Sequence, residues 1–313
     1  MNDAETFEAH RPHLVAHAYR MLGDVGRAED LVQETWLRWA GRKVSVQSPR
    51  AYLLKTVTRL CLSELTSARR RREIRGDRLP EPIDLQANDL DQVERLEEIS
   101  MAFVVLLQRL TAAERATFLL RDVFDFSHRE IGELLGKSDA ACRQLLKRAR
   151  ACVAEERRSF EVSDAEHSRL LHAFVRAARD GDQASLSALL HADVVMIADA
   201  GAEGRRYGGV KNLPGPLIGR RKVAAFAASV APRGAGSLTI EERRLNGRPA
   251  ILVWRDGRPD TAISVAVVDR KLRAIFLQAD PTRLRFEAPR TVQTVPANVE
   301  GSDADGRCER GDP

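Results

Sequence analysis

The spacing of apolar residues changes in kind near Phe160, and this change constrains the fold more than any other feature of the sequence. Before it, apolar side chains recur every three or four residues, which is the repeat of an amphipathic helix. After it come two more helical segments and then, from Ser237 onward, four strand-like runs separated by turn signals. The 313 residues are enough for two or three domains. We therefore predict a mainly helical N-terminal half and a C-terminal α+β domain.

Local signals mark where several helices of the first half begin. Ser48 can cap a helix whose first turn contains Pro49, a residue that needs no hydrogen-bond donor there. The segments Thr111–Glu114 and Ser127–Glu130 both match the capping-box pattern. A further helix begins at Ser138, after a short turn that contains glycine. The last two helices, joined in this way, predict a helix-turn-helix.

Basic residues gather on the second helix of this motif and at one other place, although the net charge is only +5. Arginine can pair with guanine and glutamine with adenine in the major groove, so a basic helix of this kind predicts DNA binding. The helix that begins at Ser48 ends in a run of arginines. The candidate DNA-binding side chains of the helix-turn-helix are Arg143, Gln144, Lys147 and Arg148.

The segment Leu79–Asp91 differs from the sequence on either side. Pro80 and Pro82 lie so close together that a helix is improbable, and they favour an extended chain. Acidic and amide residues follow. We predict a linker here.

The second half combines helix and hairpin signals. A capping box at Ser163–Glu166 begins a helix, and Val194–Ala198 is predicted to be a strand. Asn246-Gly247, Asp256-Gly257 and a turn near Asp269 predict an antiparallel meander with a curved sheet. From about Glu287 onward there is no apolar periodicity, so residues 287–313 are predicted to be disordered.

Several classes of protein are disfavoured by what the sequence lacks. It has no apolar run of about eighteen residues for a membrane helix and no secretory signal, and its four cysteines show no CxxC spacing. We therefore expect a cytoplasmic protein without a disulfide framework, metal site or cofactor. His10, His13 and His17 share a helical face, but Pro12 interrupts them, and we expect a solvated, partly packed face instead of a metal site.

The stretch Phe7–Arg158 resembles a bacterial RNA polymerase sigma factor of the extracytoplasmic-function (ECF) type. The matching words are AEDLVQETWLRW (Ala28–Trp39), SPRAYLLKTVTRLCLSEL (Ser48–Leu65) and the long run Leu110–Arg150. The resemblance implies sigma region 2 over residues 1–78, a linker over 79–92 and sigma region 4 over 93–158. It also implies two partners, core RNA polymerase and promoter DNA.

By the same resemblance, each region receives a role. The segment Ala28–Trp39 would bind the β′ clamp of the polymerase, and the helix from Ser48 would bind the −10 element. Region 4 would read the −35 element and contact the β flap. The implied polymerase-binding residues are Asp30, Gln33, Glu34 and Trp36, and the implied −10 residues are Lys55, Arg59, Ser63, Arg69, Arg70, Arg71 and Arg72.

Residues 166–286 resemble the fused, cone-shaped SnoaL-like domain that a sigma-J-like subgroup of this family carries. The Leu-Pro-Glu-Pro linker, the glycine-rich segment that begins at Asp199 and the Asp280–Leu284 segment match motifs of that subgroup. The resemblance implies that this domain regulates the two DNA-binding modules. The implied regulatory residues are Leu79, Pro80, Glu81, Pro82, Asp199, Gly201, Asp280, Pro281 and Leu284.

The predicted function is therefore an alternative sigma factor, a non-catalytic subunit that directs promoter-specific initiation. Two other functions stay open at this point. One is a one-component regulator that binds operators and senses a small molecule through its C-terminal domain. The other is an enzyme with a DNA-binding extension, for which His172, His191, Asp193 and Asp199 are the available catalytic groups.

Overall fold

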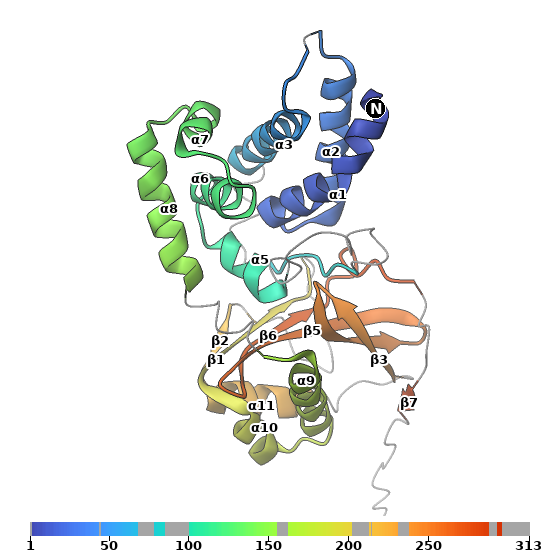
Figure 1. Cartoon of the computed structure of the whole chain (residues 1–313). Coiled ribbons are helices and arrows are strands. Elements are labelled where there is room, and N and C mark those ends of the chain that lie inside the picture. Colours follow the sequence, from blue (N-terminus) through green and yellow to red (C-terminus); the bar gives the residue numbers. More distant parts are fainter. Residues whose placement is uncertain are drawn as a thin grey trace, which may run out of the picture.

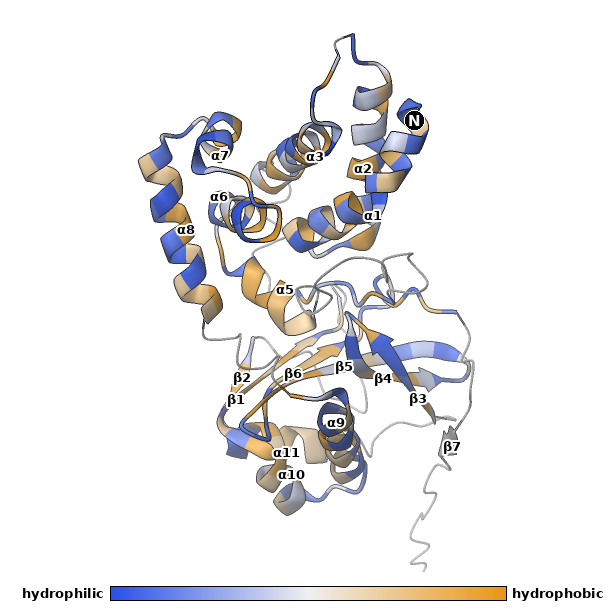
Figure 2. Cartoon of the chain, in the orientation of Figure 1, coloured by the Kyte–Doolittle hydropathy of each residue, from blue (hydrophilic) through white to orange (hydrophobic). Residues whose placement is uncertain are grey.

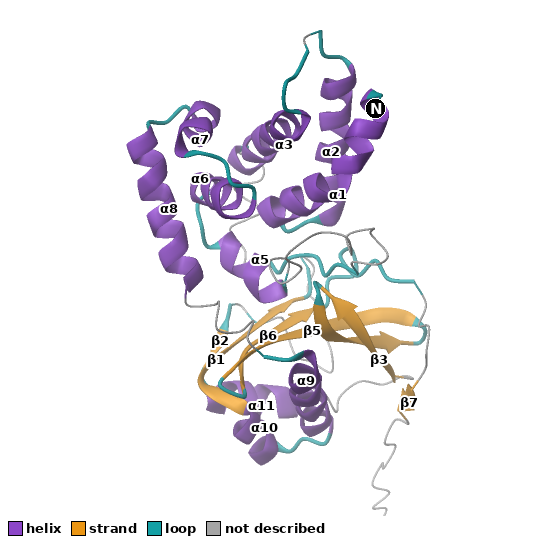
Figure 3. Cartoon of the chain, in the orientation of Figure 1, coloured by secondary structure: helices purple, strands orange, loops and turns teal. Residues whose placement is uncertain are grey.

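The structure, a computed structural model, describes residues 2–43, 45–67, 78–84, 100–154, 162–201, 213, 215–230 and 238–287, together with the backbone of 293–295. Helices make up the first half of the chain, and one sheet with further helices on its far side makes up the second (Figures 1 and 3). The predicted fold class is confirmed. The Arg69–Arg72 run and most of the predicted tail and linker lie outside the described residues.

In the described part of the chain, the first module contains the helices α1 (Asp3–Leu22), α2 (Val25–Ala40) and α3 (Pro49–Thr66). Asn2 and Asp24 cap α1 and α2, and Ser48 caps α3 as predicted. Contrary to expectation, α1 continues through Pro12. His17 is wholly buried and not solvated. Its Nε2 lies 2.8 Å from the Thr58 hydroxyl of α3, so the buried ring keeps a polar partner.

The second module contains α5 (Met101–Gln108), α6 (Ala112–Phe118), the π-helical turn η2 (Leu119–Val123), α7 (His128–Leu135) and α8 (Asp139–Ala154). The capping boxes predicted at Thr111 and Ser127 are present, whereas at Ser163 the side chain accepts from the Glu166 amide without the return bond of a capping box. Gly136 adopts φ 64° and ends α7, so α7 and α8 form the predicted helix-turn-helix.

Among the described residues, the C-terminal domain contains a seven-stranded sheet and the helices α9, α10 and α11. In chain order these are α9 (Asp164–Arg179), α10 (Gln183–Leu189), β1 (Leu190–Asp199), β2 (Leu217–Ile218), α11 (Arg220–Val230), β3 (Leu238–Leu245), β4 (Arg248–Arg255), β5 (Arg258–Val268), β6 (Lys271–Gln278) and β7 (Gln293–Val295). The strand order is β2-β1-β6-β5-β4-β3-β7.

The three predicted turns connect β3 to β6 as an antiparallel meander. Three features differ from the prediction. Strand β1 pairs parallel to β6, α11 was not expected, and part of the tail predicted to be disordered forms β7 along the edge of β3.

Apolar residues of both helical modules form one continuous core. Helix α5 joins this core to the sheet: Phe103, Val104 and Leu107 face the helices, whereas Met101 and Ala102 pack with sheet residues such as Phe276. Because it is buried on both sides, α5 is apolar all round, as its colour in Figure 2 shows. One face of the sheet is thus covered by α5 and the other by α9–α11 (Figure 1).

Candidate functional site

Helix α2 presents a polar face to solvent. Asp30 and Gln33 are exposed, and Glu34 and Trp36 are half-buried. Arg27 pairs with Asp30 at 2.8 Å, while the Trp36 ring packs on Phe7 with its centroid 5.1 Å away. The sequence analysis missed Leu37, whose side chain is 63% exposed beside these polar groups. An exposed leucine among polar residues is typical of a protein-binding surface when it belongs to a larger patch.

The basic face of α8 is solvent-exposed as predicted. Cys142, Leu146 and Ala149 face inward, and Arg143, Gln144, Lys147 and Arg148 are all exposed. Arg143 forms an ion pair with Asp139 one turn earlier. The four side chains therefore lie together on one open face that is suited to a groove of duplex DNA.

Helix α3 is less open. Arg59 and Ser63 are exposed, but Lys55 is half-buried beneath the second module. Its Nζ lies 3.8 Å from Oε1 of Glu130 on α7 and 5.7 Å from the centre of the Phe126 ring. Glu130 belongs to the capping box of α7, so the first helix of the helix-turn-helix covers one of the predicted −10 residues.

Other contacts also hold the two helical modules together. The Phe124 ring meets His17 edge-on, with centroids 5.2 Å apart. Arg115 of α6 is buried and donates to the Met21 carbonyl at the end of α1, where a cation is favoured by the helix dipole. Burial lowers the pKa of Arg115 to about 10, which leaves the guanidinium charged near neutral pH.

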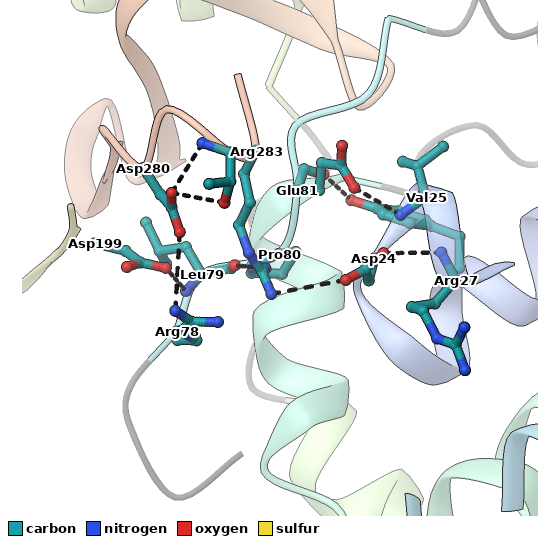
Figure 4. Close-up of polar contacts among 12 residues, drawn as sticks. Asp24, Val25, Arg27, Arg78, Leu79, Pro80, Glu81, Asp199, Asp280 and Arg283 are labelled. Atoms are coloured by element: carbon teal, nitrogen blue, oxygen red, sulfur yellow. Dashed lines mark hydrogen bonds and ion pairs between the residues drawn. The ribbon is translucent and has the colours of Figure 1, made fainter. Parts of the chain in front are cut away.

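The linker motif lies between the helical modules and the sheet. We call residues 78–84 the strap. It is extended, as the two prolines predicted, and Leu79, Pro80, Glu81, Pro82 and Ile83 are all buried. Figure 4 shows side chains from both bodies turned toward it.

The sheet binds the strap at Leu79. Its amide donates to Asp199 Oδ2 at 3.0 Å, and its carbonyl accepts from Arg283 Nη1 at 2.7 Å. Arg283 also reaches Asp24 at the start of α2, with 3.9 Å between Nη2 and Oδ2. Asp199 ends β1 and Arg283 follows β6, so the neighbouring ends of two parallel strands supply both groups.

The helices bind the strap at Glu81. Its amide donates to Gly23 O at 2.9 Å, and its carbonyl accepts from the Tyr19 hydroxyl at 2.7 Å. Its side chain accepts from the Val25 amide at 2.8 Å, so the strap helps to cap α2. Burial raises the pKa of Glu81, and the Val25 amide partly offsets this.

Asn246, in the turn between β3 and β4, completes the junction. Its backbone amide donates to Ile83 O at 2.7 Å, and its Oδ1 accepts from Ile83 N at 3.1 Å. Its Nδ2 donates to the Tyr19 hydroxyl at 2.7 Å. One phenol thus connects α1, the strap and the sheet.

The remaining predicted regulatory residues lie next to the strap. Gly201 has φ 81°, and a Cβ on it would lie 2.8 Å from Cγ of Asp280. Asp280 is buried and accepts from the Thr282 amide at 2.9 Å, which orders the turn that carries Arg283. Leu284 is buried with Trp254, and Pro281 is exposed. The sequence analysis missed Tyr19, Asn246 and Arg283, which are far from the strap along the chain.

Comparison with known proteins identifies the family. A model of sigma-70 region 2 matches residues 6–71, and a model of sigma-70 region 4 matches residues 100–153. The ECF RNA polymerase sigma factor SigJ of Mycobacterium tuberculosis is 35% identical over 295 residues, which cover 90% of this chain and 93% of SigJ. The chain belongs to the ECF sigma factor family.

Two further comparisons agree. The probable ECF sigma factor SigI of M. tuberculosis is 34% identical over 288 residues, covering 89% of this sigma factor and 93% of SigI. The crystal structure of M. tuberculosis SigJ superimposes with a TM-score of 0.69 and 31% identity, covering 90% of this chain and 97% of that one. The similarity therefore extends through the C-terminal SnoaL-like domain.

This sigma factor is thus a promoter-specific initiation factor whose partners are core RNA polymerase and promoter DNA. That conclusion decides against the one-component regulator. A sigma factor is a non-catalytic specificity subunit. Among the described residues no helix is long and apolar enough to cross a membrane.

Each candidate catalytic group of the C-terminal domain has a partner in the structure, and for His191 that partner is another candidate, Asp193. His172 contacts Glu242, His191 lies 4.0 Å from Asp193, and Asp199 accepts from the strap. Side chains of one apolar cluster, including Leu171, fill the space between α9–α11 and the sheet.

Proposed function

We propose that this sigma factor binds the β′ clamp of core polymerase through the exposed face of α2 and the β flap through region 4. The exposure of Asp30, Gln33 and Leu37 on one helix supports the first contact. Half-buried Glu34 and Trp36 would contribute at its edge. We place this activity in the cytoplasm, where core polymerase works.

We infer that α3 binds the −10 element and that α8 reads the −35 element. Arg59 and Ser63 on α3 are open to a DNA strand, and the four polar residues of α8 form one exposed face. Lys55 reaches DNA only after it separates from Glu130. Separation of the two modules would free the Lys55 side chain, so we expect binding of both elements at once to favour an open arrangement that polymerase stabilises.

We further infer that the C-terminal domain restrains this opening through the strap, while having no catalytic role of its own. The observation that carries the inference is the Tyr19 hydroxyl, which bonds to both the strap and Asn246. The strap connects the two helical modules along the chain. Because it is bonded both to the first module and to the C-terminal domain, it limits how far the two helical modules can separate.

Replacement of Tyr19 by phenylalanine tests this role directly. Tyr19→Phe removes both hydrogen bonds of the buried hydroxyl, a loss of about 1–3 kcal/mol. We expect run-off transcription with limiting core polymerase to rise about threefold or more, because the open arrangement becomes easier to reach. A transcript yield equal to that of the unmodified protein would show that the strap does not restrain the separation of the two modules.

A point variant serves better than truncation after Arg158. Removing the sheet would expose the side of α5 that carries Met101 and Ala102, so lost activity could reflect misfolding. Arg258→Gln, at the exposed first residue of β5 away from the strap, is a suitable control for substitution within the domain. Circular dichroism of each variant should remain unchanged.

A further inference from the structure

Four positions form one stripe along α2. Gly26, Asp30, Gln33 and Leu37 follow one another at intervals of four, three and four residues, which places them on the same face of the helix. Asp30 and Gln33 are exposed. Among the described residues, Leu37 is one of two large hydrophobic residues that are highly exposed. This stripe is the surface that we assign to core polymerase.

The first position of the stripe is covered by a side chain from the C-terminal domain. The Arg285 guanidinium lies over Gly26, so that a Cβ added to the glycine would be 3.0 Å from Nη1 and 3.5 Å from Nη2. Arg285 belongs to the segment that follows β6. A side chain at position 26 would displace the Arg285 guanidinium from this place.

Part of Arg285 is fixed and part is free. Its Nε faces Glu81 Oε1 of the strap at 3.5 Å and donates to Thr282 O at 3.4 Å. Within the described part of the chain, neither Nη nitrogen makes a hydrogen bond. The side chain is 66% exposed. A positioned guanidinium with unused donors loses little entropy when it binds a carboxylate.

We propose that Arg285 extends the polymerase-binding surface of α2, so that the C-terminal domain itself contacts core RNA polymerase. The proposal rests on the assignment of α2 to polymerase binding. Arg285 continues the stripe beyond Gly26, and the group it fits is a carboxylate on the polymerase. The C-terminal domain is then both a restraint on the linker and part of the bound complex.

Arg283 provides a matched control, because Arg285 also touches the strap through Glu81. Arg283 binds the strap at Leu79 O, but its side chain is only 14% exposed. If Arg285→Gln weakens polymerase binding by disturbing the strap, Arg283→Gln should weaken it as well. If it does so by removing a direct contact with polymerase, Arg283→Gln should not. Arg258, exposed at the start of β5, controls for loss of a surface charge elsewhere.

The experiment measures the affinity of the full-length protein for core polymerase over a range of salt concentrations. We expect Arg285→Gln to weaken binding about tenfold at low salt and to flatten the salt dependence, because a charged hydrogen bond is lost. Arg285→Lys should restore most of the salt dependence. Arg258→Gln should stay within about twofold of the unmodified protein, and Arg283→Gln, which loosens the strap, should not weaken binding.

Two results would overturn the proposal. The first is unchanged affinity in Arg285→Gln while Gln33→Ala weakens binding, which would leave α2 as the docking helix without the C-terminal domain. The second is an equal loss in Arg283→Gln and Arg285→Gln with the same salt dependence, which would assign Arg285 to the strap alone. If Gln33→Ala and Arg285→Gln both bind normally, the assignment of α2 itself fails.

Discussion

Tyr19 shows at the scale of one residue how distant segments become connected. Its hydroxyl donates to a carbonyl 62 residues away and accepts from an amide 227 residues away. Burial raises the pKa of Tyr19, so the phenol remains protonated and keeps its donor. Because the phenol and its neighbours are buried, this one oxygen links α1, the strap and the β3–β4 turn through hydrogen bonds shielded from water.

Gly201 combines a left-handed backbone with a close neighbour, so a single methyl group should be costly there. Its φ of 81° is unfavourable for other residues, and a Cβ would collide with the Asp280 carboxyl group at 2.8 Å. We expect Gly201→Ala to lower the free energy of unfolding by about 2–3 kcal/mol in urea denaturation. Gly257→Ala isolates the backbone cost, since φ is 75° there but the space is open. Equal losses in the two variants would contradict the collision.

Buried histidines should make stability depend on pH. Burial lowers the pKa of His17 to about 3, and Arg20 adds to the effect. The unfolded chain, with a pKa near 6.5, binds a proton that the folded chain rejects, so stability falls as pH drops below about 6.5. His17→Gln should reduce the stability difference between pH 7 and pH 5 by about 2 kcal/mol in urea melts. A full pH dependence in the variant would contradict this assignment.

At the scale of elements, sequence signals predicted the features that depend on nearby residues. Ser127 and Glu130 form their capping box three residues apart, and Asn246 with Gly247 turns a hairpin between adjacent strands. Helix α11 was missed because its first residues are three cations, an unusual start for a helix. The parallel pairing of β1 with β6 was missed because it joins segments far apart in sequence.

The two basic elements should respond differently to substitution. Arg143→Ala or Gln144→Ala on α8 should cost about 1–3 kcal/mol and relax preference at particular −35 bases. Substitutions in the Arg69–Arg72 run should weaken all promoters alike and flatten the salt dependence, because phosphates carry no sequence. Binding of a set of promoter variants at several salt concentrations separates these outcomes. Identical behaviour of both sets would contradict the distinction between base-specific contacts by α8 and phosphate contacts by the Arg69–Arg72 run.

At the scale of the whole molecule, the sequence predicted the parts better than their packing. Nothing in the local pattern indicates that both helical modules share one core, since each stripe is apolar whichever partner it meets. The candidate regulatory residues were predicted from motifs, and the structure brings most of them to the strap. Their partners came from elsewhere in the chain, through contacts that only the folded protein defines.

Glu130→Gln should favour separation of the two modules. Glutamine can keep the capping box of α7 but removes the ion pair with Lys55, a contact that is partly exposed and worth at most about 1 kcal/mol. We expect DNA containing the −10 element to bind up to about fivefold more tightly, with a longer mean distance between fluorophores on α2 and α8. Glu130→Ala, which also breaks the cap, should in addition lower thermal stability. Unchanged distance and affinity in Glu130→Gln would mean that this pair does not hold the modules together.

The all-apolar surface of α5 has a consequence for biosynthesis. A ribosome releases this helix well before the strands that cover Met101 and Ala102, because those strands lie near the end of the chain. During that interval the nascent polypeptide exposes a hydrophobic surface to solvent. Late-made strands thus finish the burial of an early-made helix, so incomplete translation products should aggregate or be degraded.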